Sequence, residues 1–316
     1  MIELVFPTAA ALFLYFVAVP ILTIAVSLAI RVFRRNVAHA HEMGSSLVWL
    51  LLVSPVAVPS VWLLFAVGHQ LDGQHGIVAC LAAHDVGIIC VDLALVALFV
   101  LAPMTFRALR SRRPDTCAAF RPETIAGIRF YRARSVPELV CTRGLWRPRI
   151  ELDDEVVEAL HPDQLTAVLL HERAHARSRD PLRKWLAHLC LSLNPLAALL
   201  RRDLARWELG REVRCDLEAV RSGADRFRLA EALIRVARCA PADLGSRCCG
   251  LVGVDSLELR VRVLCETSLP DVGPDRATIV AIATLVLLLW PHDGGLGALS
   301  WLHHSAEAGW LLVVGG

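Results

Sequence analysis

The sequence predicts a mainly α polytopic membrane protein of three or four transmembrane helices, into which a charged α+β domain is inserted. Two observations predict this fold class. The chain of 316 residues is 55% hydrophobic, with a mean hydropathy of +0.51, and its charges are segregated. Of the 33 lysines and arginines, three are Arg31, Arg34 and Arg35, and the rest lie between Arg107 and Arg276. Such segregation is typical of membrane topology, so we expect no direct nucleic-acid binding.

Apolar runs divide the chain into a transmembrane region, a charged domain and a C-terminal part. Three runs are long enough to cross a bilayer, namely 4–30, 47–67 and 77–104. A fourth run, 277–290, is short for a crossing, so a fourth transmembrane helix competes with a re-entrant or interfacial helix. The three parts are therefore the three-helix transmembrane region 1–104, the domain 105–276, and the fourth segment with a short extracytoplasmic tail, 277–316.

The positions of the basic residues orient these spans. Arg31, Arg34 and Arg35 directly follow the first run, which places the N-terminus outside and the next loop inside. Loop 68–76 has no basic residue and is expected outside, whereas the third run ends before Arg107 and returns inside. We therefore expect a multi-pass protein of the plasma or inner membrane, surrounded by lipid, with its charged domain in the cytoplasm.

The charged domain is expected to begin with a small sheet. Within segment 125–152, alternating or short apolar runs predict strands at Ile128–Tyr131, Leu139–Cys141 and Arg149–Leu152. Gly144 is expected to form a turn between the second and the third.

Helices are expected to follow, and residues suited to helix starts mark where they begin. Asp153 or Asp154 can cap a short helix, and Pro162 can begin the next one at a favoured first-turn position. Two further cap-and-proline starts are Asp180-Pro181 and Asn194-Pro195. The helix from Pro195 is expected to end near Gly223, since glycine is a common C-terminal stop.

The strongest local signal is the segment His171-Glu172-Arg173-Ala174-His175. Residues four apart lie on one face of a helix, so His171 and His175 can bind a single Zn²⁺. Glu172 then lies beside the metal without binding it, where it can take a proton from an attacking water during peptide hydrolysis. The competing interpretation is a helix with two unrelated histidines.

A third ligand is expected from the acidic helix that follows. Glu212 and Asp216 are four residues apart, so one carboxylate can bind the metal while the other orients a histidine ligand. Glu208, one turn before Glu212 on the same face, is the second candidate for the ligand. Alternatively, these acids form a solvated stripe paired with surface arginines. The candidate arginines are Arg201, Arg202, Arg211 and Arg214.

Together these motifs resemble the BlaR/MecR-type family of membrane antirepressor zinc metallopeptidases. The resemblance rests on HERAHARSRD at 171–180 with Pro181-Leu182 after it, Asn194-Pro195-Leu196, Arg201-Arg202-Asp203-Leu204, Glu212-Val213-Arg214-Cys215-Asp216, and the segment 144–150 upstream. It covers roughly residues 140–220 by motif and the membrane layout by pattern. It implies that 105–276 is a cytosolic α+β domain of the zincin type, specifically gluzincin-like, with one Zn²⁺ per chain.

The resemblance also implies a role for each motif residue. The implied zinc ligands are His171, His175 and Glu212, with Glu172 as general base and Asp216 holding a ligand from behind. Asp180 would support a ligand in the same way, unless it only caps the helix that begins at Pro181.

The segment Arg147-Pro148-Arg149-Ile150 resembles the strand that precedes the zinc helix in that family. We expect it to be an edge strand that receives substrate by strand addition, although an ordinary core strand fits the sequence as well. The implied substrate is a protein, namely a winged-helix repressor, the chain itself, or both. Tyr131 and His188 are chemically able to stabilise the oxyanion.

One difference from the family and two other functions complete the expectations. Receptor members carry an extracellular penicillin-binding domain, and no serine-acylation motif is present here, so sensing by acylation is not expected.

An HtpX-like quality-control protease would also use a His-Glu-x-x-His motif and a downstream glutamate, but would cleave many unrelated substrates. A non-enzymatic membrane signalling protein would instead hold a structural zinc with a fourth protein ligand.

Overall fold

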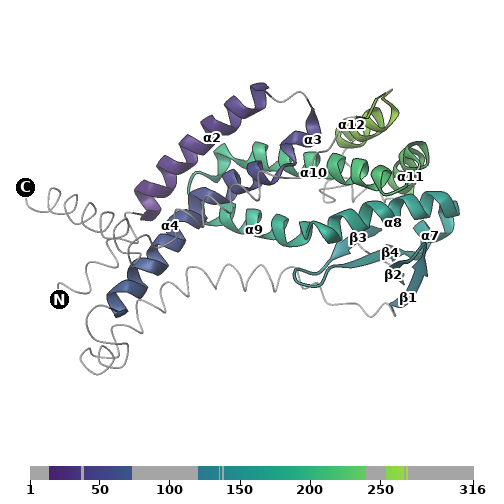
Figure 1. Ribbon diagram of the computed structural model, residues 1–316, viewed down its shortest axis with the longest axis horizontal. Helices are drawn as coiled ribbons and strands as arrows, with labels where there is room; N and C mark the ends of the chain where they lie inside the picture. Colours follow the sequence, from purple (N-terminus) through teal and green to yellow (C-terminus); the bar gives the residue numbers. More distant parts are fainter. Residues whose placement is uncertain are drawn as a thin grey trace, which may run out of the picture.

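The structure is a computed structural model, and it describes residues 14–36, 39–72, 120–134, 136, 139–239, 254–266 and 268–269. The chain is mostly helical, with one small mixed sheet (Figure 1). The predicted third and fourth membrane segments, 77–104 and 277–290, lie outside the described residues. The expected number of three or four spans therefore stays a prediction.

The N-terminal region consists of two long apolar helices joined by a short one. A π-helical turn, Leu14–Ala18, leads into α2, Val19–Asn36, which is followed by α3, Ala40–Met43, and α4, Ser46–Asp72. Two stretches, Tyr15–Asn36 and Ala40–Ser60, are apolar and long enough to cross a membrane. They fall on the first two predicted spans, and Pro55 and Pro59 lie inside α4.

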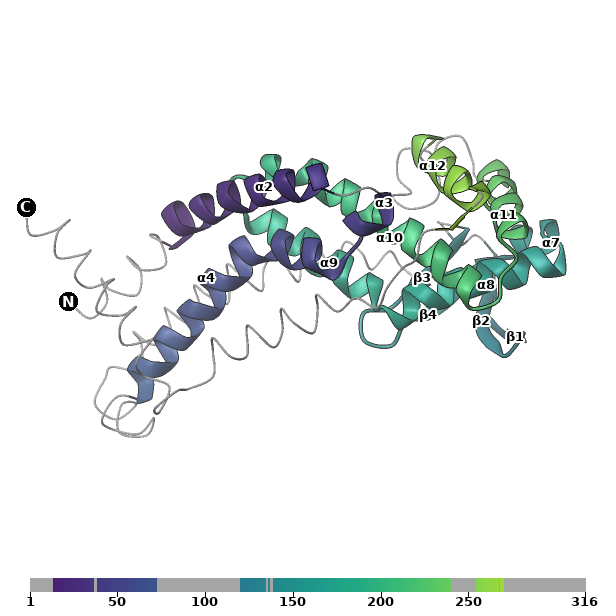
Figure 2. The same cartoon turned by 45° about the horizontal axis from the view of Figure 1, so that its top comes forward.

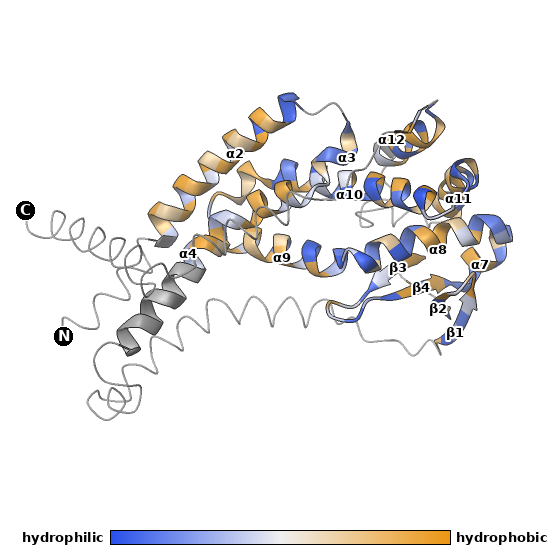
Figure 3. Ribbon diagram, viewed as in Figure 1, coloured by the Kyte–Doolittle hydropathy of each residue, from blue (hydrophilic) through white to orange (hydrophobic). Residues whose placement is uncertain are grey.

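Helix α2 has two apolar faces with different surroundings. Val26 and Ile30 are buried against the rest of the protein, while Ile21, Ile24 and Leu28 are exposed on the opposite side. Figure 3 shows the helix as hydrophobic along most of its length, with a hydrophilic end next to α3. An exposed apolar stripe of this length suits contact with lipid, because water would solvate it poorly.

The sheet has the strand order β1-β2-β4-β3. Its strands are β1, Arg121–Ile125, β2, Ile128–Ala133, β3, Val140–Arg143, and β4, Arg149–Asp153. The β2–β4 pair is parallel and the other two pairs are antiparallel. The three predicted strands are confirmed, but β1 was missed because its largely exposed sequence has no apolar face. Ala126 and Gly127 both have positive φ, as a tight two-residue hairpin turn requires.

The expectation that segment 147–150 is an edge strand is wrong. Arg147 and Pro148 precede β4, which lies between β2 and β3, and Arg149 and Ile150 pair with β3. Ile150 is also buried, because it faces the core. The edge strands of the described sheet are β1 and β3.

In the described part of the chain, seven helical segments follow the sheet. They are α7, Asp154–Ala159, α8, Pro162–Arg177, α9, Asp180–Leu193, the 3₁₀ turn Ala197–Leu199, α10, Arg201–Arg221, α11, Arg226–Cys239, and α12, Val254–Cys265. Asp153 caps α7 by accepting a hydrogen bond from the backbone N–H of Glu155, and Pro162 is the first residue of α8, as predicted.

Two of the predicted helix starts differ in detail. The helix expected from Pro195 begins instead at Arg201, because the Asn194 side chain accepts the Leu196 N–H and forms a turn. Asp180 does not cap α9, since it is the first helical residue and Arg179, with φ of 52°, is the cap. The side chain of Asp180 is therefore available for other contacts.

The elements form layers that meet at α8. This helix packs on β2, β3 and β4, while α10 and α11 pack on α8 and α12 packs on both α10 and α11 (Figures 1 and 2). The main apolar core lies between the sheet, α8 and α11. A second core joins the apolar helices to this domain, with residues from α2, α4, α9 and α10. The Asn194 amide, for example, donates to Thr23 Oγ1 of α2 at 2.9 Å.

Candidate metal centre

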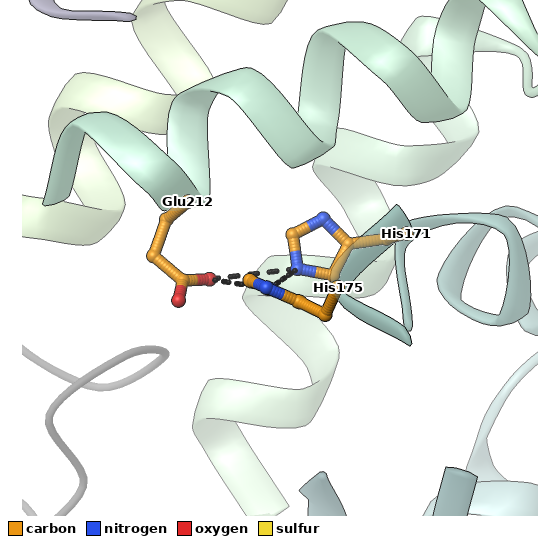
Figure 4. A group of neighbouring side chains, drawn as sticks. All are labelled: His171, His175 and Glu212. Atoms are coloured by element: carbon orange, nitrogen blue, oxygen red, sulfur yellow. Dashed lines mark hydrogen bonds and ion pairs between the residues drawn. The ribbon is translucent and has the colours of Figure 1, made fainter. Parts of the chain in front are cut away.

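Three side chains from two helices converge at the centre of the domain. His171 and His175 lie one turn apart on the buried face of α8, with 3.1 Å between their Nε2 atoms. Glu212 of α10 points at both, with its Oε2 3.5 Å from His171 Nε2 and 3.4 Å from His175 Nε2 (Figure 4). All three are buried, so they do not form the solvated acidic stripe that was the alternative.

The geometry of this group fits a metal ion. Ligand atoms that lie about 2.0–2.1 Å from a tetrahedral zinc ion are about 3.3 Å from one another. The three separations here, 3.1, 3.4 and 3.5 Å, agree with that spacing. Two imidazoles and one carboxylate are also a donor set that leaves one tetrahedral position for water or substrate.

Behind His171 lies a buried carboxylate with its own cation. His171 Nδ1 is 2.8 Å from Asp216 Oδ1, so the other ring nitrogen, Nε2, faces the metal position. Arg260 of α12 donates to the two oxygens of Asp216 at 2.7 Å each and is fully buried. This places Asp216 where a support for a histidine ligand was expected.

Behind His175 lies a second arrangement of the same kind. Its Nδ1 is 2.8 Å from Asp180 Oδ2, and Arg211 of α10 donates to the same oxygen from Nη2 at 2.9 Å. Asp180 is 1% exposed, which makes these contacts its main environment. Of the two roles considered for Asp180, the structure places it behind the histidine and excludes that of a helix cap.

Glu212 has a cation partner as well. Lys184 of α9 donates to Glu212 Oε1 at 3.1 Å, which leaves Oε2 directed at the two histidines. The three carboxylates of Glu212, Asp216 and Asp180 thus meet the three cations Lys184, Arg260 and Arg211. Because these charges cancel, the buried centre can accept a divalent cation without first carrying an excess of negative charge.

The protonation of the histidines follows from these neighbours. Burial disfavours a charged imidazole, but Asp216 outweighs burial and raises the pKa of His171. Glu212 and the hydrogen bond with Asp180 do the same for His175, whose pKa lies well above its ordinary value of 6.5. Burial would raise the pKa of Glu212, yet nearby cations hold it well below its usual range. A metal that binds these nitrogens would therefore compete with protons up to a higher pH than at an ordinary histidine.

Glu172 is held next to the sheet rather than in the ligand group. Thr142 Oγ1, on the edge strand β3, is 2.7 Å from Glu172 Oε2 and 3.1 Å from the Glu172 carbonyl oxygen. Glu172 is 2% exposed, and a small apolar recess borders it and His171. The recess is lined by Val140, Val168, Leu229, Leu233 and Val236.

The remaining candidates from the sequence lie elsewhere. Glu208 contacts His188, with 2.9 Å between Oε1 and Nε2, and is not part of the group around His171. Tyr131 lies on β2 with the guanidinium groups of Arg129 and Arg149 each 5.5 Å from its ring centre.

A second group of potential ligands shares His175. Its other members are Asp180 and Cys215, whose Sγ is 3.4 Å from His175 Nδ1. Asp180 Oδ2 already accepts hydrogen bonds from Arg211 at 2.9 and 3.2 Å, whereas in the first group the guanidinium of Arg260 lies 3.5 Å from both Glu212 Oε2 and His171 Nε2. The group of His171, His175 and Glu212 is therefore the better metal site.

Sequence reasoning missed the residues that surround the ligands. Lys184, Arg260 and Thr142 carry no motif, and Arg260 lies 89 positions after His171, to which its Nη2 comes within 3.5 Å. Arg211 was expected only as a surface partner of the acids. The sequence of α10 gives no signal for these residues, because it has more arginines than acids, and only the structure shows that Glu212 and Asp216 are buried and need cations.

Comparison with known proteins relates this part of the chain to a family. Residues 129–264 match the family model described as BlaR1 peptidase M56. No curated protein and no solved structure matches significantly. The match spans from β2 to α12 and includes each ligand candidate and each of its charged partners. Residues 129–264 are therefore similar to the BlaR1-type peptidases of family M56, which supports the resemblance that the motifs had indicated.

Proposed function

We propose that the chain is a membrane-bound zinc endopeptidase in which His171, His175 and Glu212 bind one Zn²⁺. The observation that carries the proposal is the convergence of these three side chains at distances suited to one ion. Each ligand is also held by a charged partner, which is how proteins fix the orientation of metal ligands. Because only three protein ligands converge among the described residues, the site fits catalysis better than a closed structural zinc.

In this proposal Glu172 is the general base and later the general acid. Zinc bound at the centre would lower the pKa of a water molecule and polarise the substrate carbonyl. The Glu172 carboxylate accepts a proton from the attacking water and then delivers it to the leaving amine. Thr142 contacts one carboxylate oxygen of Glu172 and fixes its orientation, leaving the other oxygen for the water.

The substrate is proposed to bind along β3 rather than along 147–150. β3 is one of the two edge strands of the described sheet. It packs against α8, and its Thr142 contacts Glu172. A peptide that adds to this edge would form main-chain hydrogen bonds and run past the base. An extended segment of a protein is therefore the expected substrate, which favours endopeptidase activity.

The catalytic domain is proposed to lie on the cytoplasmic side. The segment between the two apolar helices contacts α10 directly, with Trp207 Nε1 donating to the Ser45 carbonyl at 3.2 Å. The same side carries Arg31, Arg34 and Arg35 at the end of α2. Basic residues next to a membrane helix are typical of the cytoplasmic side, which supports this orientation and an N-terminus outside.

The cellular role that we propose is signal-activated cleavage of a transcriptional repressor, of the chain itself, or of both. This part of the proposal rests on the family that residues 129–264 match and on the cytoplasmic orientation. A general quality-control protease is the alternative, and a substrate-trapping experiment with an inactive variant separates the two. Capture of one or two specific partners supports the signalling role, whereas capture of many unrelated proteins supports quality control.

The direct test compares the purified full-length protein with Glu172→Gln in detergent. We expect about one zinc per chain in both, because the substitution removes the base and leaves the three ligands. Self-cleavage should occur in the wild type alone. Loss of zinc in Glu172→Gln would contradict the assigned roles, and absence of zinc from both proteins would remove the enzyme proposal.

A further inference from the structure

The metal centre has a direct connection to the segment between the two apolar helices. We define this segment as the junction, residues 39–45, which contains α3 and links α2 to α4. The junction packs on α10 at Gly44 and Gly210, where a Cβ added to either glycine would lie 2.3 Å from backbone atoms of the other segment. Only glycine allows backbones to approach so closely, so the fit between the two segments is tight at this point.

Arg211, the residue after Gly210, bridges the junction and the metal centre. Its Nη1 donates to the Gly44 carbonyl at 3.4 Å, while Nε and Nη2 donate to Asp180 Oδ2 at 3.2 and 2.9 Å. Asp180 Oδ2 is in turn 2.8 Å from His175 Nδ1. A continuous series of hydrogen bonds therefore runs from the junction backbone to a metal ligand.

We propose that Arg211 is a positioning residue through which the junction between the membrane helices sets the orientation of His175 and hence zinc affinity. The inference rests on the proposed function, since it requires that His175 binds the metal. One guanidinium serves both partners, so a shift of the junction moves the donors that hold Asp180. The 3.4 Å bond to Gly44 is near the limit for a hydrogen bond, so a small displacement breaks it.

The other ligands are supported by different elements. His171 is supported through Asp216 by Arg260 of α12, and Glu212 by Lys184 of α9. A displacement of the junction relative to α10 would act through Arg211 on the His175 side. A stimulus that moves the junction would therefore change zinc binding through one ligand, His175.

The test measures zinc affinity of the metal-free, full-length protein by competition with a chromophoric chelator, so the readout does not require cleavage. Gly210→Ala forces the junction away from α10 without changing a ligand or Arg211. We expect it to weaken zinc binding by about 10- to 100-fold, the usual effect of disturbing a group behind a metal ligand. Gly223→Ala is the control. It strains the backbone just after the same helix, because Gly223 has a φ of 104°, but the added Cβ has no neighbouring atom within 4 Å to displace.

A double-mutant cycle identifies Arg211 as the route. In an Arg211→Met background, zinc affinity is already lowered and Gly210→Ala should lower it no further, because the two changes act through the same bonds. Arg211→Lys retains a cation beside Asp180, so it should restore much of the affinity and still be insensitive to Gly210→Ala. If Gly210→Ala prevents folding, Trp207→Phe replaces it, because it removes the bond to Ser45 with a smaller steric change.

The outcomes separate the two proposals. Loss of affinity on Gly210→Ala in the wild type but not in Arg211→Met supports the role of Arg211. Unchanged affinity in Gly210→Ala and Trp207→Phe overturns it, as does an equal loss in both backgrounds, and in either case zinc binding itself still stands. A wild-type protein that binds no zinc overturns the proposed function and this inference together.

Discussion

The two histidines of the metal centre have supports of the same chemistry but of different origin. Behind His171 are Asp216 and Arg260, which belong to α10 and α12 inside the peptidase domain. Behind His175 are Asp180 and Arg211, and Arg211 also contacts the junction between the apolar helices. The His171 side is thus internal to the domain, whereas the His175 side joins it to the membrane region.

The two aspartates also differ in what stabilises their negative charge. Asp180 is the first residue of α9, where the helix dipole favours an anion, and it has His175 and Arg211 as partners. Asp216 lies within α10, with no helix start near it, and Arg260 supplies its two shortest bonds. The internal side therefore depends more on a single cation, and the following predictions test that difference.

The largest effect on stability is expected from Arg260→Met. The substitution leaves Asp216 buried without its main cation, which typically costs about 3–5 kcal/mol of unfolding free energy. Arg211→Met should cost less, because Asp180 keeps the helix dipole. Arg262→Met on the same helix is the control, since its ion pair with Glu258 is exposed and worth little. Chemical denaturation of the metal-free proteins measures all three, and an equal loss for Arg260→Met and Arg211→Met would remove the contrast between the two sides.

Removal of Glu212, whose Oε2 lies close to both histidines, should have the largest effect on zinc affinity. Glu212→Ala takes away one of three ligands, and we expect zinc affinity to fall by at least about 100-fold. Glu208→Ala, one turn earlier on α10, removes the contact to His188 and no metal ligand, so it should change affinity far less. Competition with a chelator measures both variants. The reverse result would move the third ligand to Glu208.

A pH titration tests the protonation of both sides. The pKa values of His171 and His175 are raised, so the stability that their protonation adds to the metal-free protein is fully present below about pH 6.5 and is lost as pH rises through the raised values. Zinc has to displace these protons, so its affinity should increase with pH, and over a higher range than for ordinary histidines. Zinc affinity that does not change between about pH 6 and 9 would show that the histidines are already neutral.

The smallest effect is expected from Thr142→Val, which keeps the shape of the side chain and removes the hydroxyl next to Glu172. Loss of one hydrogen bond that orients the base should lower the rate of self-cleavage by at most about tenfold. Zinc affinity should not change, because Thr142 contacts neither histidine. A fall in zinc affinity would mean that β3 supports the ligands rather than the base.

The sequence predicted the site residues that lie one turn apart on a single helix. It missed those that only the packing of separate helices brings together. His171, Glu172 and His175 follow from helix geometry, and the strands and most helix starts follow from alternation and from proline positions. Arg260 and Lys184 could not be predicted, because only the packing of α9 and α12 on α10 brings them to the acids. The choice between an edge strand and a core strand for 147–150 could not be made for the same reason, because only the pairing of β2 with β4 places β4 inside the sheet.

The most direct test of the proposed centre is X-ray absorption spectroscopy of the zinc-loaded, full-length protein. Two imidazoles, one carboxylate and a water should surround zinc with nitrogen and oxygen neighbours at about 2.0–2.1 Å and no sulfur. Glu212→Ala should change the oxygen contribution, while the two imidazole signals remain in any zinc that is still bound. A sulfur neighbour at about 2.3 Å would instead place zinc with Cys215, Asp180 and His175, and would contradict the catalytic assignment.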